Sequence, residues 1–522
     1  MLHLLTSCAL SIKTRHLIPV LAPLRLEYTH QRRHMSSDLS SDLKMLINGR
    51  LVPAEDGKTT GVINPATGRV FVRVPDASRR DLDHAVAAGR NAFASWRKTP
   101  FEQRANCLAK FAAALKARSS EFAEVLTKEQ GKPLMFAMGE VMSCVNKCID
   151  LGKEDLLKPT VVNATKKGRV EVHYLPRGVV GGITPWNFPM SMAANKVFPA
   201  VITGNTIVLK PSPYTPVTTI MMGQIAQKCF PPGVVNIVSG GNELGKWIVA
   251  HPDVAHITFT GSEATGRHIM AEASKSIKKV TLELGGNDAA IVLPGTDIRV
   301  AAPKIFQGAA FNSGQTCVCI KRVYVHESQY EDMVRAIGAA ATSASVGDGM
   351  QKGTMYGPMN NQMQLSRVEE LVADAVATGG RLVAGGERFS TGIPGQENGY
   401  FYKPTIIADV TDDTRLVKEE QFGLALPILK YKNVAEAVKR ANDSKYGLGG
   451  SVWGPDAERA AEVALELECG MSWVNQHLSG TDSAPFGGWK SSGIGREGGG
   501  VIGLREFVEP KSLFVKALKG KL

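Results

Sequence analysis

The 522-residue sequence has few cysteines, few aromatic residues and no long uninterrupted apolar run. Its eight cysteines lack the dense, regular spacing of a disulfide scaffold, which predicts mostly free thiols in a reducing compartment. No apolar run approaches the roughly 18 to 20 residues that cross a bilayer, so we expect no integral membrane segment. Despite a net charge of +12, cations and acids are interspersed rather than gathered on an aromatic-rich basic face, so we expect no nucleic-acid partner.

The length and composition indicate a large folded protein with more than one domain. A chain of this length exceeds what one compact core accommodates, so we expect two or more domains. The sequence is 43% hydrophobic and 21% charged, which is ordinary for an α/β protein and too apolar for a disordered chain.

Residues 1–35 differ in composition from the rest. Basic, Leu and Ser residues dominate, and Glu27 is the one acid before Asp38. This pattern is typical of a mitochondrial transit peptide, and charges and prolines interrupt the apolar stretch that a secretory signal needs. We therefore predict a mitochondrial matrix location, with a cytoplasmic form starting at Met35 as the alternative.

The first folded segments have clear local signals. Asn48-Gly49 between short apolar runs predicts a type I′ hairpin. Ser78 and Asp81 have capping-box spacing, and apolar residues then recur at helical intervals up to Trp96. The helical pattern continues to about residue 155.

From residue 177 the sequence alternates between short apolar strands and helix-length segments. The predicted strands are VVGGIT, TIVLK, VVNIV, HITFT and KVTLEL. This order predicts βαβ units, a parallel sheet covered on both faces, and a ligand crevice at the carboxyl ends of the strands. A second series, from AAIVL to about residue 485, predicts another α/β domain.

Two further strands are expected outside these series, in VVNATKKGRVEVHYLP and in the tail LREFVEPKSLFVKAL. Unpaired strand edges in a large chain favour pairing with a second subunit. We therefore expect a homodimer or homotetramer, and packing of these strands on their own domain is the alternative.

Cys317 and Cys319 raise the question of which chemistry a C-x-C pair performs. No second Cys or His cluster lies near them in the sequence, so the spacing fits none of the usual zinc sites, and we predict no metal. A disulfide between them would need a strained ring, and most cysteines are simply buried. Cys317 follows a run of small and polar residues that allows a substrate to approach, whereas Cys319 leads into the predicted strand IKRVYV.

Two polar residues at predicted strand ends are candidates to act beside a thiol. Glu283 ends the strand KVTLEL, and a carboxylate at the mouth of an apolar crevice suits a general base; a strand-end charge satisfied by a turn is the alternative. Asn187 follows VVGGIT, where its amide could donate to a developing oxyanion or cap the next helix.

A cofactor-binding region is indicated by three further segments. FTGSEATGRHI follows the strand HITFT and opens a helix, where free N–H groups attract phosphate. Lys210 ends the strand TIVLK and is placed for an adenosine ribose or phosphate, or is a solvated surface lysine. Glu420 and Phe422 lie in a predicted loop, where a carboxylate could hold ribose hydroxyls.

Taken together, the segments PWNFP, LKPSP, FTGS, LELGG, GQTC, EEQFG and PFGGWKSSGIGRE resemble the aldehyde dehydrogenase superfamily in order and separation. The resemblance implies an aldehyde dehydrogenase-like α/β fold: a Rossmann-type cofactor domain, an α/β catalytic domain and a small β oligomerisation element. It assigns the first to residues 36–157 and 177–285, the second to 286–490 and the third to 158–176 and 491–522.

The resemblance also implies roles for individual residues. Cys317 is the nucleophile, Asn187 forms the oxyanion hole with the Cys317 N–H, and Glu283 activates water. The implied cofactor, NAD or NADP, meets Gly261 and Ser262 at the pyrophosphate, Trp186 and Lys210 at the adenosine portion, and Glu420 and Phe422 at the nicotinamide ribose and ring. The implied reaction is oxidation of an aldehyde to an acid through a thiohemiacetal and a thioester.

Departures from the family pattern concern the cofactor and the substrate. NAD-preferring relatives often have glutamate where this chain has Pro213, beside Ser212, so no negative charge repels a 2′-phosphate. Relatives specific for succinic semialdehyde have arginines where this chain has Asn195 and Phe311, so we expect that aldehyde to be a poor substrate and aliphatic or aromatic aldehydes to be better ones. A coenzyme A-acylating dehydrogenase, whose relatives commonly lack the base at 283, and a non-catalytic thiol-redox or binding protein are the alternative functions.

Overall fold

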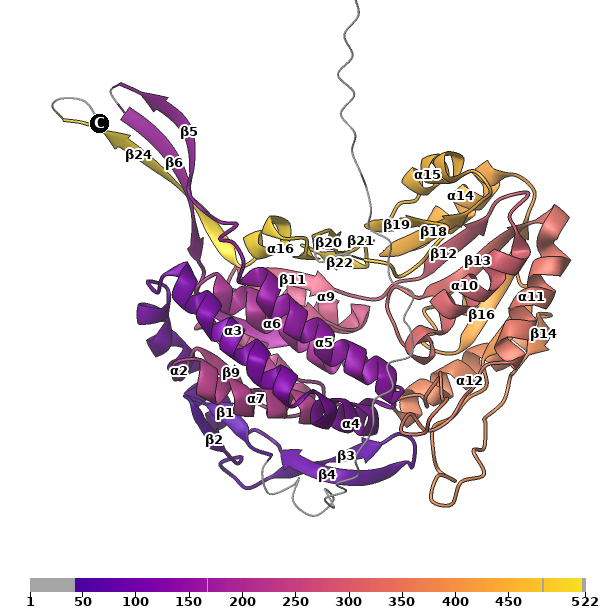
Figure 1. Ribbon diagram of the computed structural model, residues 1–522, viewed down its shortest axis with the longest axis horizontal. Coiled ribbons are helices and arrows are strands. Elements are labelled where there is room, and N and C mark those ends of the chain that lie inside the picture. Colours follow the sequence, from indigo (N-terminus) through magenta and orange to yellow (C-terminus); the bar gives the residue numbers. More distant parts are fainter. Residues whose placement is uncertain (1–42, 167, 481–482, 519–522) are drawn as a thin grey trace, which may run out of the picture. The chain divides into compact units, whose positions relative to one another are not determined.

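The structure is a computed structural model that describes residues 43–166, 168–480 and 483–518. The predicted leader, residues 1–35, lies outside the described residues. Among the described helices, none is long and apolar enough to span a bilayer. Two large sheets, each flanked by helices, contain most of the described strands (Figure 1).

The first large sheet confirms the strand series predicted after residue 177. Its order is β2-β1-β9-β8-β7-β10-β11-β22, and the strands β9, β8, β7, β10 and β11 are parallel. The bounds are β1 Met45–Ile47, β2 Arg50–Val52, β7 Val179–Ile183, β8 Thr206–Lys210, β9 Val235–Ile237, β10 Val254–Thr260, β11 Lys279–Glu283 and β22 Gly493–Ile494. The short strand β22 adds a piece of the C-terminal region to this sheet, antiparallel to β11.

The local signals at the start of the fold have the predicted geometry. Asn48 and Gly49 have φ values of 51° and 72°, and Ile47 pairs with Arg50, so the turn between β1 and β2 is the expected type I′ hairpin. The Ser78 side chain accepts from Asp81 N, and Asp81 caps the Ser78 N–H in return, which starts helix α2.

Helices of the first half surround this sheet. They are α2 Arg79–Trp96, α3 Phe101–Ala117, α4 Ser119–Gln130, α5 Leu134–Leu151, α6 Pro189–Ile202, α7 Val217–Cys229, α8 Asn242–Ala250 and α9 Glu263–Ser274. The early helical stretch ends at Leu151, slightly before the predicted residue 155, and Gly131 ends α4 in the left-handed conformation with φ 101°.

The second large sheet has the order β14-β15-β16-β13-β12-β18-β19, parallel except for β14. Its strands are β12 Asp288–Val292, β13 Ile320–His326, β14 Arg381–Ala384, β15 Thr405–Ala408, β16 Ala425–Tyr431, β18 Gly449–Trp453 and β19 Met471–Val474. Its helices are α10 Ile298–Ala310, α11 Tyr330–Thr342, α12 Gln362–Ala377, α13 Arg415–Lys418, α14 Val434–Asn442 and α15 Ala457–Leu465, with short 3-10 turns η1 Phe311–Gly314 and η2 Glu327–Gln329. Residues 284–287 connect β11 of the first sheet to β12 of the second, so Glu283 lies where the chain passes between them.

The two strands expected outside the large sheets pair within the chain. β24 Val508–Lys516 runs antiparallel to β6 Gly168–Pro176 along nine residues, and β5 Thr160–Thr165 pairs with the other edge of β6 (Figure 1). All six residues of β5 are exposed, so this strand is a free edge in the single chain. Pairing of that edge with a second subunit stays a prediction.

Three two-stranded sheets and one short helix complete the described elements. They are β3 Thr59–Asn64 with β4 Arg69–Pro75, β17 Tyr446–Gly447 with β21 Trp489–Lys490, β20 Pro485–Phe486 with β23 Glu497–Gly498, and the helix α16 Val501–Arg505.

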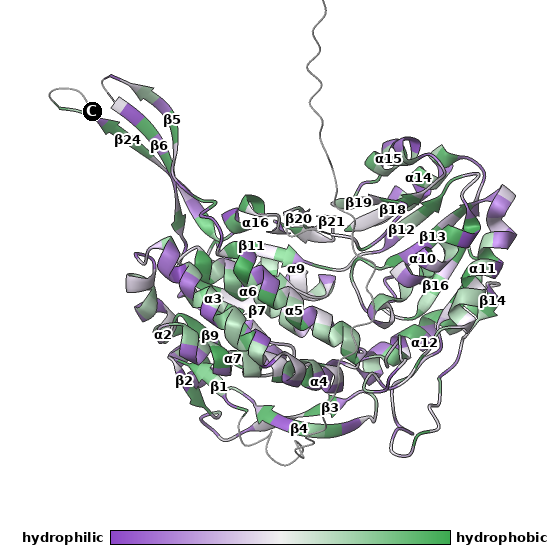
Figure 2. Cartoon of the chain, in the orientation of Figure 1, coloured by the Kyte–Doolittle hydropathy of each residue, from purple (hydrophilic) through white to green (hydrophobic). Residues whose placement is uncertain are grey.

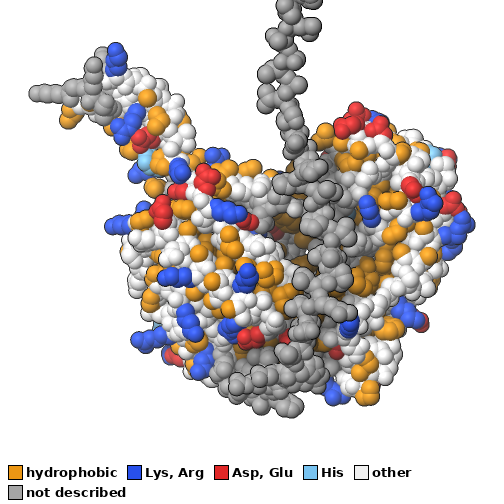
Figure 3. Space-filling model, in the orientation of Figure 1, with side chains coloured by type: hydrophobic (Ala, Val, Ile, Leu, Met, Phe, Trp, Pro, Cys, Tyr) orange, Lys and Arg blue, Asp and Glu red, His pale blue; other side chains and the backbone are white. Residues whose placement is uncertain are grey.

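Apolar side chains fill the space between sheets and helices. Figure 2 shows hydrophobic residues concentrated on strands such as β12, β13 and β16, and mixed colours along the covering helices. Trp453, Tyr324 and Tyr431 are among the largest fully buried side chains of the second sheet. On the face shown in Figure 3, Lys, Arg, Asp and Glu side chains are scattered rather than gathered into one charged patch.

Candidate active site

The carboxyl ends of four neighbouring strands in the first sheet carry most of the residues predicted to act. The strands lie in the order β8-β7-β10-β11, and Lys210, Trp186, Gly261 and Glu283 stand at or just after their ends. Ligands of open α/β sheets bind at this edge. The structure therefore brings together residues that are far apart in the sequence.

Cys317 follows a turn with an unusual backbone. Asn312, Ser313 and Gly314 have φ values of 53°, 58° and 73°, so three consecutive residues are left-handed. A Cβ on Gly314 would lie 2.3 Å from the Gly423 carbonyl oxygen, so glycine is required where the two backbones meet. This turn, residues 312–317, is called the nucleophile turn below.

The two neighbouring thiols have different surroundings. Cys317 is half-buried, whereas Cys319 is fully buried and its Sγ lies 3.5 Å from the Phe311 carbonyl oxygen. Strand β13 starts only at Ile320, so the two cysteines do not share a strand face. Burial raises the pKa of Cys319 to about 11 and raises the pKa of Cys317 further. Among residues 43–166, 168–480 and 483–518, no His, Cys, Asp and Glu group could hold a metal ion.

Asn187 is bound to the nucleophile turn. Its Nδ2 donates to the Gln315 carbonyl oxygen at 3.0 Å, and Asn312 Nδ2 donates to the Asn187 carbonyl oxygen at 3.1 Å. Helix α6 is preceded by Phe188 as N-cap, without a side-chain cap bond, so Asn187 does not cap that helix. The Asn187 side chain is thus bonded to the backbone two residues before Cys317.

A buried ion pair, which sequence reasoning missed, supports Asn187 from behind. Lys132 Nζ donates to Glu140 at 2.5 Å and to the Asn187 carbonyl oxygen at 3.0 Å, and it lies 3.8 Å from the centre of the Phe188 ring. Glu140 in turn accepts from the N–H groups of Met190 and Ser191, in the first turn of α6. Both partners come from the early helical region, where the sequence contains no sign that they meet.

Glu283 is buried without a hydrogen-bond partner. Its side chain is at the end of β11, the residue is 2% exposed, and neither carboxylate oxygen has a partner among the described residues. Burial, and then the charge of Glu497, raise its pKa well above the ordinary value. Glu497 is itself paired with the buried Lys196 at 2.7 Å. Burial of Glu283 therefore disfavours its charged form and makes its carboxylate a stronger base than an exposed one.

The phosphate side of the crevice has the predicted strand-turn-helix geometry. Ser262 caps α9 by accepting from Thr265 N at 3.3 Å, which leaves the first N–H groups of this helix for an anion. Lys210 is 4% exposed and donates to the Pro211 carbonyl oxygen at 3.2 Å, so it is not a solvated surface lysine. Burial lowers its pKa to about 8. Ser212, also buried, lies beside it.

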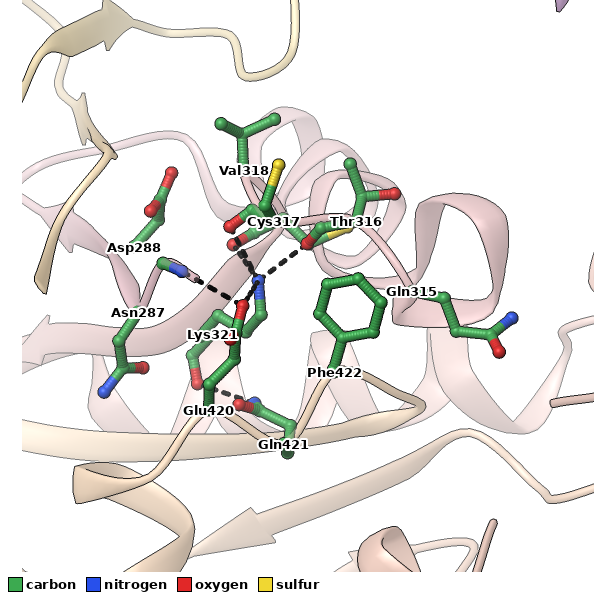
Figure 4. Close-up of polar contacts among 12 residues, drawn as sticks. Asn287, Asp288, Gln315, Thr316, Cys317, Val318, Lys321, Glu420, Gln421 and Phe422 are labelled. Atoms are coloured by element: carbon green, nitrogen blue, oxygen red, sulfur yellow. Dashed lines mark hydrogen bonds and ion pairs between the residues drawn. The ribbon is translucent and has the colours of Figure 1, made fainter. Parts of the chain in front are cut away.

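The loop before β16 carries the two residues predicted for the nicotinamide end of the cofactor, Glu420 and Phe422. Glu420 accepts from Gly286 N at 3.0 Å, and a Cβ on Gly285 would lie 2.3 Å from its other oxygen, so glycine leaves room for this carboxylate. The Phe422 ring meets the Trp186 ring edge to face at 5.4 Å and 83°. Figure 4 shows Glu420 and Phe422 on the same side of the nucleophile turn as Lys321. A helix N-terminus, a buried cation and a carboxylate are the kinds of group that bind the phosphates and ribose hydroxyls of a dinucleotide.

Three aromatic side chains pack on one another beside Asn187 and the nucleophile turn. Phe188 and Phe311 stack at 5.9 Å and 19°, and Phe136 meets Phe311 edge to face at 5.8 Å. Asn195 accepts from Lys147, a cation that the sequence reasoning did not place there. The apolar residues Met192, Leu478 and Phe486 are partly exposed.

Comparisons with known proteins agree with this geometry. The chain matches a profile of the aldehyde dehydrogenase family over residues 51–513. It is 40% identical over 475 residues to "Aldehyde dehydrogenase, mitochondrial" of Leishmania tarentolae, covering 90% of this chain and 94% of that protein. It is 39% identical over 474 residues to "Succinate-semialdehyde dehydrogenase, mitochondrial" of Arabidopsis thaliana, covering 89% and 88%. A solved NAD+ complex of an aldehyde dehydrogenase from Bacillus cereus superposes with a TM-score of 0.88 at 38% identity, covering 92% and 98%. The predicted fold class is confirmed.

Proposed function

Since this chain belongs to the aldehyde dehydrogenase family and is an NAD(P)-dependent aldehyde dehydrogenase, we propose that Cys317, Asn187 and Glu283 carry out its chemistry. The observation that carries the proposal is the hydrogen bond from Asn187 to the Gln315 carbonyl oxygen, because it fixes the proposed oxyanion donor to the turn that contains the half-buried Cys317. Glu283 ends β11, which is separated from β7 by β10, and the chain enters the second sheet after it.

In the first half of the reaction, the Cys317 thiolate attacks the aldehyde carbonyl carbon and forms a tetrahedral alkoxide. Asn187 Nδ2 and the Cys317 N–H donate to this oxyanion, an arrangement whose loss typically costs about 10²–10³ in rate. Glu420 and Phe422 would hold the nicotinamide end of NAD or NADP, which would supply the hydride acceptor as the alkoxide collapses to a thioester. The Trp186 ring packs edge to face on Phe422.

In the second half, Glu283 removes a proton from the water that attacks the thioester, which releases a carboxylic acid and the thiol. Burial of this carboxylate supports the assignment, because a base with a raised pKa is stronger. The presence of Glu283 at this place favours hydrolysis over transfer of the acyl group to coenzyme A.

We further propose that NADP is accepted because Lys210 meets the 2′-phosphate and Pro213 adds no negative charge. The pKa of Lys210 is lowered to about 8, so its ammonium is charged below that pH and neutral above it. The KM for NADP is therefore expected to rise as pH increases through 8, while the KM for NAD changes less. Steady-state kinetics with both cofactors from about pH 7 to about pH 9.5 measure this.

Lys210→Gln is the matched variant for that measurement. It is expected to raise the KM for NADP about tenfold at neutral pH and to remove the pH dependence, because a hydrogen bond to a charged group is worth about 1.5–3 kcal/mol. A ratio of the two KM values that stays constant with pH in the unmodified enzyme would show that Lys210 does not meet the phosphate.

For the substrate, we propose an aliphatic or aromatic aldehyde rather than succinic semialdehyde. The stacked Phe188 and Phe311 rings support this choice because a carboxylate buried against them would need a cation, and Lys132, which lies over the Phe188 ring, is already paired with Glu140. Lys147 is already bonded to Asn195 at the edge of this region. The similarity to a succinate-semialdehyde dehydrogenase of Arabidopsis thaliana makes succinic semialdehyde the appropriate comparison substrate.

A panel of hexanal, benzaldehyde and succinic semialdehyde tests this choice. We expect kcat/KM to be at least tenfold lower for succinic semialdehyde, and Phe311→Arg to raise that value about tenfold because arginine binds carboxylate with charge-assisted hydrogen bonds. Succinic semialdehyde emerging as the preferred substrate of the unmodified enzyme would refute the proposal.

We also propose that residues 1–35 direct the chain to the mitochondrial matrix, which their basic, acid-poor composition and the mitochondrial relatives support. A fluorescent protein fused behind residues 1–42 is expected to enter mitochondria, and a fusion starting at Met35 is expected to stay in the cytoplasm. Equal distribution of the two fusions would contradict this assignment.

A further inference from the structure

We propose that Lys321 is a positioning residue that joins the nucleophile turn to Glu420, and thereby holds the reacting carbon on Cys317 in register with the nicotinamide. The inference rests on the proposed function, because it takes Cys317 as the nucleophile and Glu420 as the carboxylate of the cofactor ribose. Neither the sequence motifs nor the reaction steps above give Lys321 a part.

The side chain of Lys321 is buried and turned toward the nucleophile turn. Its exposed fraction is 1%, and Nζ donates to the carbonyl oxygens of Thr316 at 2.7 Å, Cys317 at 3.0 Å and Cys319 at 3.4 Å. An ammonium has three N–H donors, so these bonds use its full capacity. The backbone on both sides of the Cys317 thiol is fixed to one cation.

The same residue is connected to the cofactor side at two points. Nζ lies 3.8 Å from Glu420 Oε1, and the Lys321 carbonyl oxygen accepts from Gln421 Nε2 at 3.1 Å (Figure 4). Nζ also lies 5.9 Å from the centre of the Phe422 ring. The side chain and the backbone of Lys321 thus both contact the segment 420–422, which comes from a different part of the chain.

Lys321 also opposes the negative charges that face the thiol. Cys317 is influenced by the carboxylates of Glu420, Asp288 and Glu283, all of which raise its pKa, whereas Lys321 lowers it. Asp288 is buried, and Gly449 N donates to one of its oxygens; the other accepts no hydrogen bond from the described residues and lies 3.9 Å from His477 Nε2. Removal of the Lys321 ammonium is therefore expected to raise the pKa of the Cys317 thiol.

Such a connection matters because hydride transfer is sensitive to small displacements. A misplacement of about 1 Å can cost about 10²-fold in rate even when the chemical groups are intact. Lys321→Met keeps the length of the side chain and removes its charge and its donors. We therefore expect kcat to fall about 10²-fold, the aldehyde KM to change less than about threefold, and the Cys317 turn to stay in place through Gly314 and Gly423.

The test compares Lys321→Met with Lys430→Met, a matched change on the exposed strand residue whose ammonium lies over the Tyr330 ring, away from the turn. Turnover of an aldehyde and its C1-deuterated form is measured for each. The proposal expects a larger primary isotope effect on kcat for Lys321→Met and the unmodified values for Lys430→Met. An unmodified kcat and isotope effect for Lys321→Met would overturn it.

A double-mutant cycle with Glu420→Gln tests the connection itself. If Lys321 acts through Glu420, kcat of the double variant should be no more than about threefold below that of the less active single variant. The reason is that the two changes remove one interaction. Losses that multiply would overturn the connection. An unmodified enzyme that oxidises no aldehyde would instead refute the proposed function, so the two failures are distinguishable.

Alkylation of Cys317 by iodoacetamide, followed by peptide mass spectrometry across pH, supplies a readout that does not depend on turnover. We expect the midpoint to move to higher pH in Lys321→Met. Glu420→Gln is an independent arm should Lys321→Met fail to fold, and it is expected to move the midpoint to lower pH because a carboxylate is removed. An unchanged midpoint in Glu420→Gln would contradict the proposed charge balance.

Discussion

Replacement of Cys317 by alanine is expected to abolish aldehyde-dependent formation of NADH or NADPH, with a loss of about 10⁴-fold or more in kcat. The physical reason is that no other group at the site can form the thiohemiacetal from which hydride departs. Binding of NAD should be retained, because the cofactor residues lie on other strand ends. Turnover is followed by absorbance of the reduced cofactor, and binding by the thermal shift that NAD produces.

Cys319→Ser is the matched control for this prediction. Cys319 is fully buried against the Phe311 carbonyl oxygen, so we expect its replacement to leave kcat within about threefold. A thiol-redox or metal-binding function of the pair predicts the reverse, with activity lost on Cys319→Ser. Equal losses for both variants would show that the two thiols act together.

Glu283→Gln is expected to separate the two halves of the reaction. The thioester should form at nearly the normal rate, with one burst of reduced cofactor per active site, and then persist because water is not activated. Steady-state turnover is expected to fall about 10²–10⁴-fold, the usual contribution of general base catalysis. Stopped-flow absorbance measures the burst and the slow phase in one experiment.

The pH dependence of the unmodified enzyme follows from the same residue. Burial raises the pKa of Glu283 well above its ordinary value, so the fraction of the carboxylate that can accept a proton from water grows as pH rises through that raised pKa. Deacylation is therefore expected to accelerate as pH rises, and this dependence should disappear in Glu283→Gln. A Glu283→Gln variant without a burst, or one whose steady state needs coenzyme A, would contradict the assignment.

Local sequence signals were sufficient for much of the fold. The capping box at Ser78 and Asp81, the Asn48-Gly49 turn and the apolar runs of the first sheet depend on neighbouring residues and appear where they were predicted. The strands that end at Lys210 and Glu283 were predicted from the same kind of local signal, a short apolar run. Because parallel strands place their carboxyl ends at one edge, the alternation alone indicated where the site lies.

The supporting residues could not be predicted because they depend on contacts between distant segments. Lys321 reads as one position in the strand IKRVYV, and nothing in that strand indicates the carbonyl oxygens or the Glu420 carboxylate that it meets. The Lys132–Glu140 and Lys196–Glu497 pairs are likewise buried charges whose partners are determined by packing. The sequence alone does not indicate that a charged residue is buried, because burial depends on the partner that the folded structure brings to it.

The pairing of β24 with β6 illustrates a second limit. Both strands were expected, but the choice between pairing within the chain and pairing with another subunit depends on where the tail returns. In the structure the tail lies along β6 for its whole length and leaves β5 as the free edge.

Mass spectrometry of Glu283→Gln, stopped with acid after mixing with NAD and an aldehyde, tests the central claim most directly. The claim is that the carbonyl carbon becomes covalently bonded to the sulfur of Cys317 and stays there until Glu283 activates water. We predict a mass increase equal to the acyl group on the peptide that contains Cys317, in an amount matching the burst of NADH. An unmodified peptide after a full burst, or acylation found on Cys319, would contradict the account.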